Sequence, residues 1–181
     1  ASIYASHTTT IAIILGIAFG VTFFLFPNPY VSFYQLENDI AAQAEGYLRI
    51  ISLGIPFVFL GLNFSGIYIG SGRSDIPFYF NSAGLIINII VDPLLIFGIG
   101  PFPEMGVKGA ALATIISQGV VVFLFINHLK KERGLFGGFS YFIRPRKSYT
   151  INILKLGLPI AAMNVYFAFI NMNLARIASL Y

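Results

Sequence analysis

Apolar stretches long enough to cross a lipid bilayer constrain this chain more than any other feature. A helix of roughly 20 mostly apolar residues suffices to span the hydrocarbon core. Five stretches have lengths in the spanning range, and they lie at about residues 8–26, 47–71, 76–100, 107–127 and 151–175. We therefore predict an all-α membrane protein, built as a polytopic bundle of transmembrane helices.

The composition supports a membrane protein and argues against nucleic-acid binding. Hydrophobic residues make up 57% of the chain and charged residues 10%, and the mean hydropathy is +0.82. Ordinary soluble domains carry about 25% charged residues. The net charge of +4 would suit nucleic acid only if the basic residues shared a folded polar face, and the sequence offers no such face. The chain has no cysteine, so it can form neither a disulfide nor a thiolate metal site. We expect membrane lipid around it.

Charges between the apolar stretches indicate the orientation in the membrane. Residues 27–46 contain acidic side chains but no Lys or Arg, whereas residues 128–150 contain Lys130, Lys131, Arg133, Arg144, Arg146 and Lys147. Because Lys and Arg collect in cytoplasmic loops, we predict that the basic segment and Arg73 are cytoplasmic, with Arg49 and Lys108 as exceptions. Attraction to anionic lipid is the plainest further role for this loop. A regulatory or nucleic-acid role is the alternative.

Asp92 is the strongest candidate functional residue. The apolar stretch 76–100 contains no other charged residue. A charge at the centre of a membrane helix costs about 2.5–3.5 kcal/mol and usually faces the protein interior or a water-filled path. Asn88 lies one helical turn earlier on the same face, and Pro93 lacks the N–H that would bond the carbonyl of Ile89. A neutral Asp92 that serves as a buried structural donor is the alternative.

Other polar residues extend this candidate site. At a rise of about 1.5 Å per residue, Thr114 is level with Asp92, Gln118 is level with Asn88, and Asn63 lies deeper. Taken alone, Asn63, Thr114 and Gln118 favour interhelical hydrogen bonds that hold the helices together. Beside a carboxylate, they predict a cation-coupling and substrate-binding site. Its members are Asp92, Asn88, Thr114, Asn63 and Gln118.

Small residues and prolines indicate where helices pack closely or bend. Small side chains crowd the start of the stretch 107–127, at Gly106, Gly109, Ala110, Ala111 and Ala113. They would let another helix backbone approach closely. The motifs Gly54-Ile-Pro56 and Gly157-Leu-Pro159 interrupt two stretches and predict kinks for packing, with a mechanistic hinge as the alternative.

Four sequence motifs together resemble those of the multidrug and toxic compound extrusion (MATE) family. They are the run from Asn88 through Asp92-Pro93 to Gly98, the run from Pro103 to Thr114, the turn Gly70-Ser-Gly72-Arg73, and Lys155-Leu-Gly157-Leu-Pro159. The resemblance covers nearly the whole chain, with good specificity from about Tyr47 onward and more weakly before it.

The resemblance implies about twelve helices in two six-helix lobes, with this chain as an internal piece that holds roughly helices three to seven. Residues 1–127 would belong to the N-terminal lobe, 128–150 would link the lobes, and 151–181 would begin the C-terminal lobe. The implied activity is cation-coupled antiport that exports drugs or other organic compounds across the cell membrane. It implies no catalysis and no cofactor, and its partners would be lipid, a small organic substrate and the remaining helices.

The resemblance also matches Asp92 and Asn88 to the family's first-lobe cation site, with Thr114 and Asn63 on neighbouring helices. Oxygen atoms of Asp92, Asn88 and Thr114 suit a hard cation, which makes them candidate Na⁺ ligands. Desolvation of a carboxylate instead favours proton uptake. Both H⁺ and Na⁺ therefore stay open as the coupling ion. The acidic residue that many members place on their first helix lies outside this sequence.

Three other functions fit the sequence less well. A lipid-linked oligosaccharide flippase of the same superfamily would share the helix plan, but it should line its cavity with more basic residues than Arg49, Lys108, Lys155 and Arg176. An intramembrane enzyme would need a nucleophile with a base or a metal cluster, and His7 and His128 lie at span ends. A non-transporting structural membrane subunit would leave Asp92 unexplained.

Overall fold

The structure, a computed structural model, describes residues 2–131, 139–144 and 146–178, and all regular secondary structure in these ranges is helical. This confirms the predicted all-α fold. The helices are α1 (Ser2–Leu25), α2 (Pro27–Ser32), α3 (Asn38–Ser52), α4 (Ile55–Gly70), α5 (Asp75–Ile96), α6 (Val107–Lys131) and α7 (Lys147–Ala178). Four of them, α1, α5, α6 and α7, are each long and apolar enough to cross a membrane. The chain is thus a multi-pass membrane protein.

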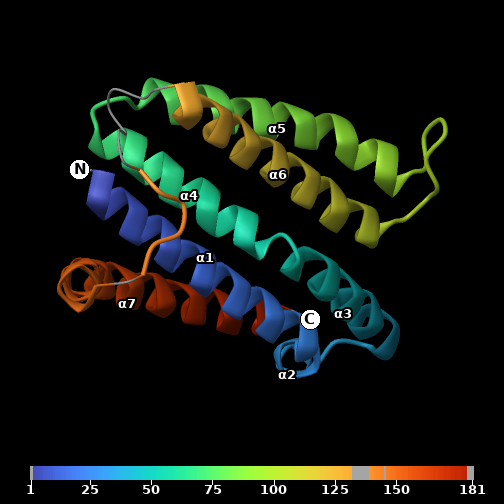
Figure 1. The fold of residues 1–181 in the computed structure, drawn as a ribbon. Helices are drawn as coiled ribbons and strands as arrows, with labels where there is room; N and C mark the ends of the chain where they lie inside the picture. The colour runs from blue at the N-terminus through green and yellow to red at the C-terminus, as the bar shows by residue number, and fades with distance from the viewer. Residues whose placement is uncertain (1, 132–138, 145, 179–181) are drawn as a thin grey trace.

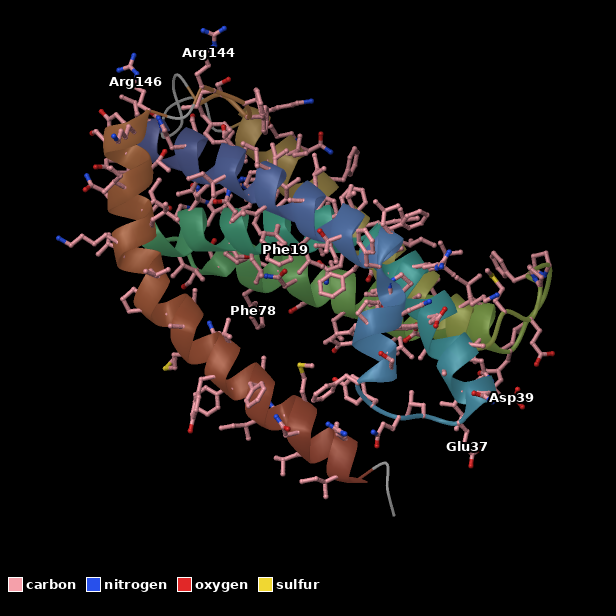
Figure 2. All side chains as sticks on the ribbon, turned by 90° about the horizontal axis from the view of Figure 1, so that it is seen from below. Phe19, Glu37, Asp39, Phe78, Arg144 and Arg146 are labelled. Carbon is pink, nitrogen blue, oxygen red and sulfur yellow. The ribbon has the colours of Figure 1, made fainter. Side chains whose placement is uncertain are left out.

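The long helices form a bundle in which neighbours along the chain run in opposite directions (Figure 1). Helices α5 and α6 lie side by side, α1 packs against α4, and α6 also contacts α3 and α4. Helix α7 has its main contact with α1, and it diverges from the bundle toward its C-terminal end (Figure 2). The aromatic core lies between α4 and α6, where Phe64, Tyr68 and Phe125 are fully buried.

The second predicted span, 47–71, is a broken helix. Helices α3 and α4 together could form a fifth span, and they are bent by 50° at the break. Pro56, the second residue of α4, has no N–H and is tolerated in the first turn of a helix. Gly54 is needed because a Cβ there would lie 2.7 Å from Cγ1 of Ile115 on α6. The predicted bend at Gly54 is confirmed. At the other motif α7 continues through Pro159 without a break, so the expected kink there stays a prediction.

The connections differ from the prediction in two places. Residues 27–46 were expected to be a connection, but they contain α2 and the first turns of α3. The start of α3 is rich in polar residues, so a search for apolar stretches does not identify it as a helix. The predicted loop 128–150 is shorter, because α6 continues to Lys131 and α7 begins at Lys147. Arg133 of that loop lies outside the described residues.

Close packing of α5 on α6 follows from small residues, as predicted. A Cβ on Gly109 would lie 2.5 Å from the carbonyl oxygen of Leu95. Ala111 and Ala113 are fully buried. The two helix backbones therefore approach so closely that a larger side chain at position 109 would not fit.

Two arginines and two acidic residues that flank the spans lie at opposite ends of the long axis of the bundle. Figure 2 shows Arg144 and Arg146 at one end and Glu37 and Asp39 at the opposite end. We call these the basic end and the acidic end. Because basic residues collect on the cytoplasmic side of a membrane protein, this separation underlies the prediction that the basic end is cytoplasmic.

Candidate functional site

Asn88 and Asp92 carry two of the three buried side-chain polar atoms that have no hydrogen-bond partner among the described residues. The atoms are Nδ2 of Asn88 and Oδ1 of Asp92, and the third is Oγ1 of Thr150. Burying a polar atom without a partner costs about 1–3 kcal/mol, so such atoms in a folded protein call for an explanation. Two of them one turn apart on α5 mark a place where a polar ligand would be stabilised.

The backbone of α5 adds a further acceptor at this level. Pro93 lies within the helix, which continues to Ile96. The proline ring has no N–H, so the carbonyl of Ile89 lacks its usual helical donor. Carboxylate, amide and carbonyl groups are therefore available within one stretch of α5.

Close contacts between α5 and α6 show that Thr114 lies at the same level along the helix axes as the stretch from Asn88 to Asp92. A Cβ on Gly84 would meet Val121, and a Cβ on Gly109 would meet Leu95. In an antiparallel pair with this register, Thr114 lies at a height between Asn88 and Asp92. The Thr114 hydroxyl donates to the carbonyl of Ala110 at 3.0 Å. The hydroxyl proton is thereby engaged, and the lone pairs of the hydroxyl oxygen are left to accept a hydrogen bond or to coordinate a cation.

Gln118 and Asn63 are directed toward other helices. A Cβ on Gly61 of α4 would lie 3.7 Å from Oε1 of Gln118, so this amide reaches toward α4. Nδ2 of Asn63 donates to Oγ1 of Thr9 on α1 at 2.8 Å. Among the described residues, no hydrogen bond joins any two of the five predicted site residues. Asn88 and Asp92 therefore form the centre of the candidate site, and Thr114 is its nearest neighbour in height.

Thr9, the partner of Asn63, was not among the predicted site residues. Thr9 and Thr10 are fully buried, and Ser6 and His7 are almost so. The signal for this polar start of α1 was present, because His7 and three consecutive threonines open an otherwise apolar stretch. The direction in which they face could not be read from the sequence.

The Asp92 carboxylate belongs to no described cluster of strong metal ligands. In the ranges that the structure describes, no three His, Cys, Asp or Glu side chains cluster as a metal site would require. Within the described part of the chain, the groups that could meet a cation at Asp92 are its own carboxylate and neutral oxygens. That set fits a proton or a hard monovalent cation better than a divalent transition metal, which favours nitrogen or sulfur ligands.

Comparison with known proteins gives consistent results. The MatE family model matches residues 1–94. The probable multidrug resistance protein NorM of Thermotoga maritima is 33% identical over 146 residues, which are 80% of this chain and 29% of that protein. The probable multidrug resistance protein YoeA of Bacillus subtilis is 27% identical over 161 residues, 87% of this chain and 35% of that protein.

A third relative and a solved structure agree with these. The multidrug export protein MepA of Staphylococcus aureus is 28% identical over 158 residues, 85% of this chain and 34% of that protein. The structure is described as the inward-facing conformation of a multidrug resistance MATE family transporter of the MOP superfamily. It matches with a TM-score of 0.73 at 24% identity, over 86% of this chain and 34% of its own. That likeness supports the fold, and the chain spans about a third of the length of these relatives.

Proposed function

The chain belongs to the MatE family, and on that premise we propose that it is part of a secondary active transporter that exports drugs or other organic compounds. The proposal is supported by the names of the relatives, which describe multidrug resistance and multidrug export. The four single-helix spans and the bent α3–α4 pair suit a lobe of such a transporter. We place it in the cell membrane, with the basic end in the cytoplasm.

Within that transporter, Asp92 is the residue that binds and releases the coupling cation, and Asn88 assists it. The observation that carries this assignment is the buried Oδ1 of Asp92 without a partner; Nδ2 of Asn88, one turn earlier, is an unpartnered donor that would bond an acceptor at the same site. Thr114 and the carbonyl of Ile89 supply further oxygens at neighbouring heights. Asn63 and Gln118 face α1 and α4, and they would shape the path beside the site.

Either H⁺ or Na⁺ would satisfy these groups. A proton on Asp92 would remove the charge and let the carboxyl donate to a neighbouring oxygen. A sodium ion would instead be held by the carboxylate, the amide oxygen of Asn88 and the hydroxyl oxygen of Thr114. In both cases coupling requires that the site bind its cation more tightly in one conformation than in the other.

The alternative of an oligosaccharide flippase lacks support in the positions of the basic residues. Arg176 lies 5.1 Å from the centre of the Phe33 ring. Lys108 reaches Gly46, where a Cβ would lie 3.0 Å from its Cε. These two cations are engaged near the acidic end, and the cavity that Lys108 helps to line also contains the acidic Glu104, which would repel an anionic lipid-linked substrate.

Transport by the full-length protein tests the proposal. The protein would be reconstituted into liposomes, and uptake of a fluorescent organic cation would be followed under an imposed H⁺ gradient, an Na⁺ gradient or neither. We expect accumulation under at least one ion gradient, and none with the isolated 181-residue chain, because alternating access rocks one repeat against another. Accumulation of the organic cation that is the same with and without either ion gradient would rule out cation coupling.

A further inference from the structure

The segment before α7 is tied to the start of α1 by three hydrogen bonds from backbone to side chain. The backbone N–H groups of Ser140 and Ile143 donate to the hydroxyls of Ser6 and Thr10, each at 3.0 Å. The backbone N–H of Arg146 donates to Nε2 of His7 at 3.2 Å. We call the described residues 139–144 and 146 the strap. Figure 1 shows it, in orange, crossing α1 on its way to α7.

The partners of His7 determine its protonation state. Nδ1 lies 2.8 Å from the carbonyl oxygen of Ile3, which can only accept, so Nδ1 carries a proton. Nε2 accepts from the N–H of Arg146, so it must offer a lone pair. Both bonds are satisfied only by the neutral imidazole with its proton on Nδ1. The ring is 2% exposed, so water cannot easily replace either partner.

A second proton on His7 would break its bond to the strap. Nε2–H would then point at the backbone N–H of Arg146, and two hydrogen-bond donors cannot bond to each other. The new charge would be buried and would need a compensating partner. The charged groups described beside it are cationic instead. His7, Arg144 and Arg146 help to line a cavity of about 330 Å³, and none of its described lining residues is acidic.

Two tyrosines, one from α7 and one from α1, lie on this side of His7. The ring of Tyr149 has its centroid 4.8 Å from that of His7 and tilts by 38° against it. Tyr4 packs edge-on against Tyr149. These phenols present no negative charge at neutral pH. The neutral form of His7 is therefore the one that fits the closed strap.

We propose that His7 is a second proton-binding site, separate from Asp92, and that binding of a proton there releases the strap from α1. Imidazole is the side chain whose charge changes between about pH 5 and 8. The strap leads directly into α7, whose main contact among the described helices is α1. Release would thus loosen the attachment of α7 to the bundle at the basic end. The inference does not depend on which ion drives transport.

The bonds to Ser6 and Thr10 provide an internal comparison. Hydroxyl oxygens accept hydrogen bonds at every pH in this range. Ser6→Ala or Thr10→Val should therefore favour release of the strap by the same factor at all pH values and leave the increase in release at low pH unchanged. Only a change at position 7 should remove this pH-dependent step.

Site-specific labelling in the full-length protein, freed of any other cysteine, tests the proposal. Ile143→Cys would report release of the strap, and Lys130→Cys, at an exposed position at the basic end, would be the reference that cancels the effect of pH on thiol reactivity. The ratio of labelling rates would be measured at about pH 7.5 and pH 5.5, on either side of imidazole titration. We expect it to rise about tenfold at the lower pH, which corresponds to about 1.4 kcal/mol.

Substitutions of both histidines identify the sensor. The amide oxygen in His7→Gln can accept from Arg146 but does not titrate, so the ratio should stay low at both pH values. His128→Gln changes the other histidine of the chain, which pairs with the Tyr68 hydroxyl, and should keep the step. His7→Asn would replace His7→Gln if that variant does not fold. A ratio in the parent protein that ignores pH, or a step that survives substitution at position 7, would overturn the proposal.

Discussion

The amide nitrogen of Asn63 on α4 donates a hydrogen bond to the hydroxyl oxygen of Thr9 on α1 over 2.8 Å. This bond divides the predicted site residues into two groups. Asn63 is engaged with α1, whereas Asn88 and Asp92 on α5 each keep a buried atom without a partner. Structural and functional roles can therefore be separated by substitution.

The bond between Asn63 and Thr9 should contribute mainly to stability. In a double-mutant cycle of Asn63→Leu and Thr9→Val, we expect a coupling energy of about 0.6 kcal/mol, with about 1.7 kcal/mol as the upper range for such bonds in membrane proteins. Reversible unfolding in detergent or bicelles would measure it. Strictly additive effects of the two substitutions would show that the bond contributes nothing.

Gly109 should tolerate no side chain, because a Cβ there would lie 2.5 Å from the carbonyl oxygen of Leu95 and the backbone cannot move aside cheaply. We expect Gly109→Ala to destabilise the protein by about 1–3 kcal/mol, as overpacking does. Gly119 lies on the same helix, and a Cβ added there would meet no atom within 4 Å, so Gly119→Ala is the matched control. Equal thermal stability of the two variants would contradict the packing described for α5 and α6.

The orientation in the membrane can be read by labelling single cysteines. Ser140 and Asn38 are both exposed, and they lie in the strap and at the start of α3, respectively. We expect Ser140→Cys to react with an impermeant thiol reagent from the cytoplasm only, and Asn38→Cys from the outside only, because basic residues favour the cytoplasmic side. Reaction of both from the same side would be incompatible with five spans.

Much of the fold could be predicted from the sequence because the bilayer imposes a length and a polarity on each span. The apolar stretches were enough to indicate α1, α5, α6 and α7. The helical turns at the start of α3 were missed, because Asp39, Gln43 and Glu45 make them as polar as a loop. Helical structure there depends on contacts with α1 and α6, which no local pattern records.

The candidate site was predictable where it depends on one helix and unpredictable where it depends on several. Asn88 and Asp92 share a face because they are one turn apart. The direction of Asn63 depends on how α4 is rotated against α1, and that rotation is set by packing. The strap joins residues more than a hundred positions apart, such as Ser6 and Ser140, and nothing in the sequence pairs them.

The central claim is that Asp92 binds and releases the coupling cation. Asp92→Asn keeps the size and the hydrogen-bonding capacity of the side chain but removes the group that ionises. Coupling should therefore fail while the fold survives, since the loss of a charge in a membrane helix does not oppose insertion. Asp75→Asn is the matched control, because it removes an exposed carboxylate from the first turn of the same helix.

Accumulation of an organic cation in liposomes that hold the full-length protein tests this claim most directly, with thermal stability measured in parallel. Under whichever H⁺ or Na⁺ gradient drives the parent protein, we expect Asp75→Asn to accumulate the compound and Asp92→Asn to lose all gradient-driven accumulation at unchanged stability. If folded Asp92→Asn still accumulates the compound against its gradient, Asp92 is not the coupling residue. If Asp92→Asn does not fold, Asp92 is instead a buried structural donor.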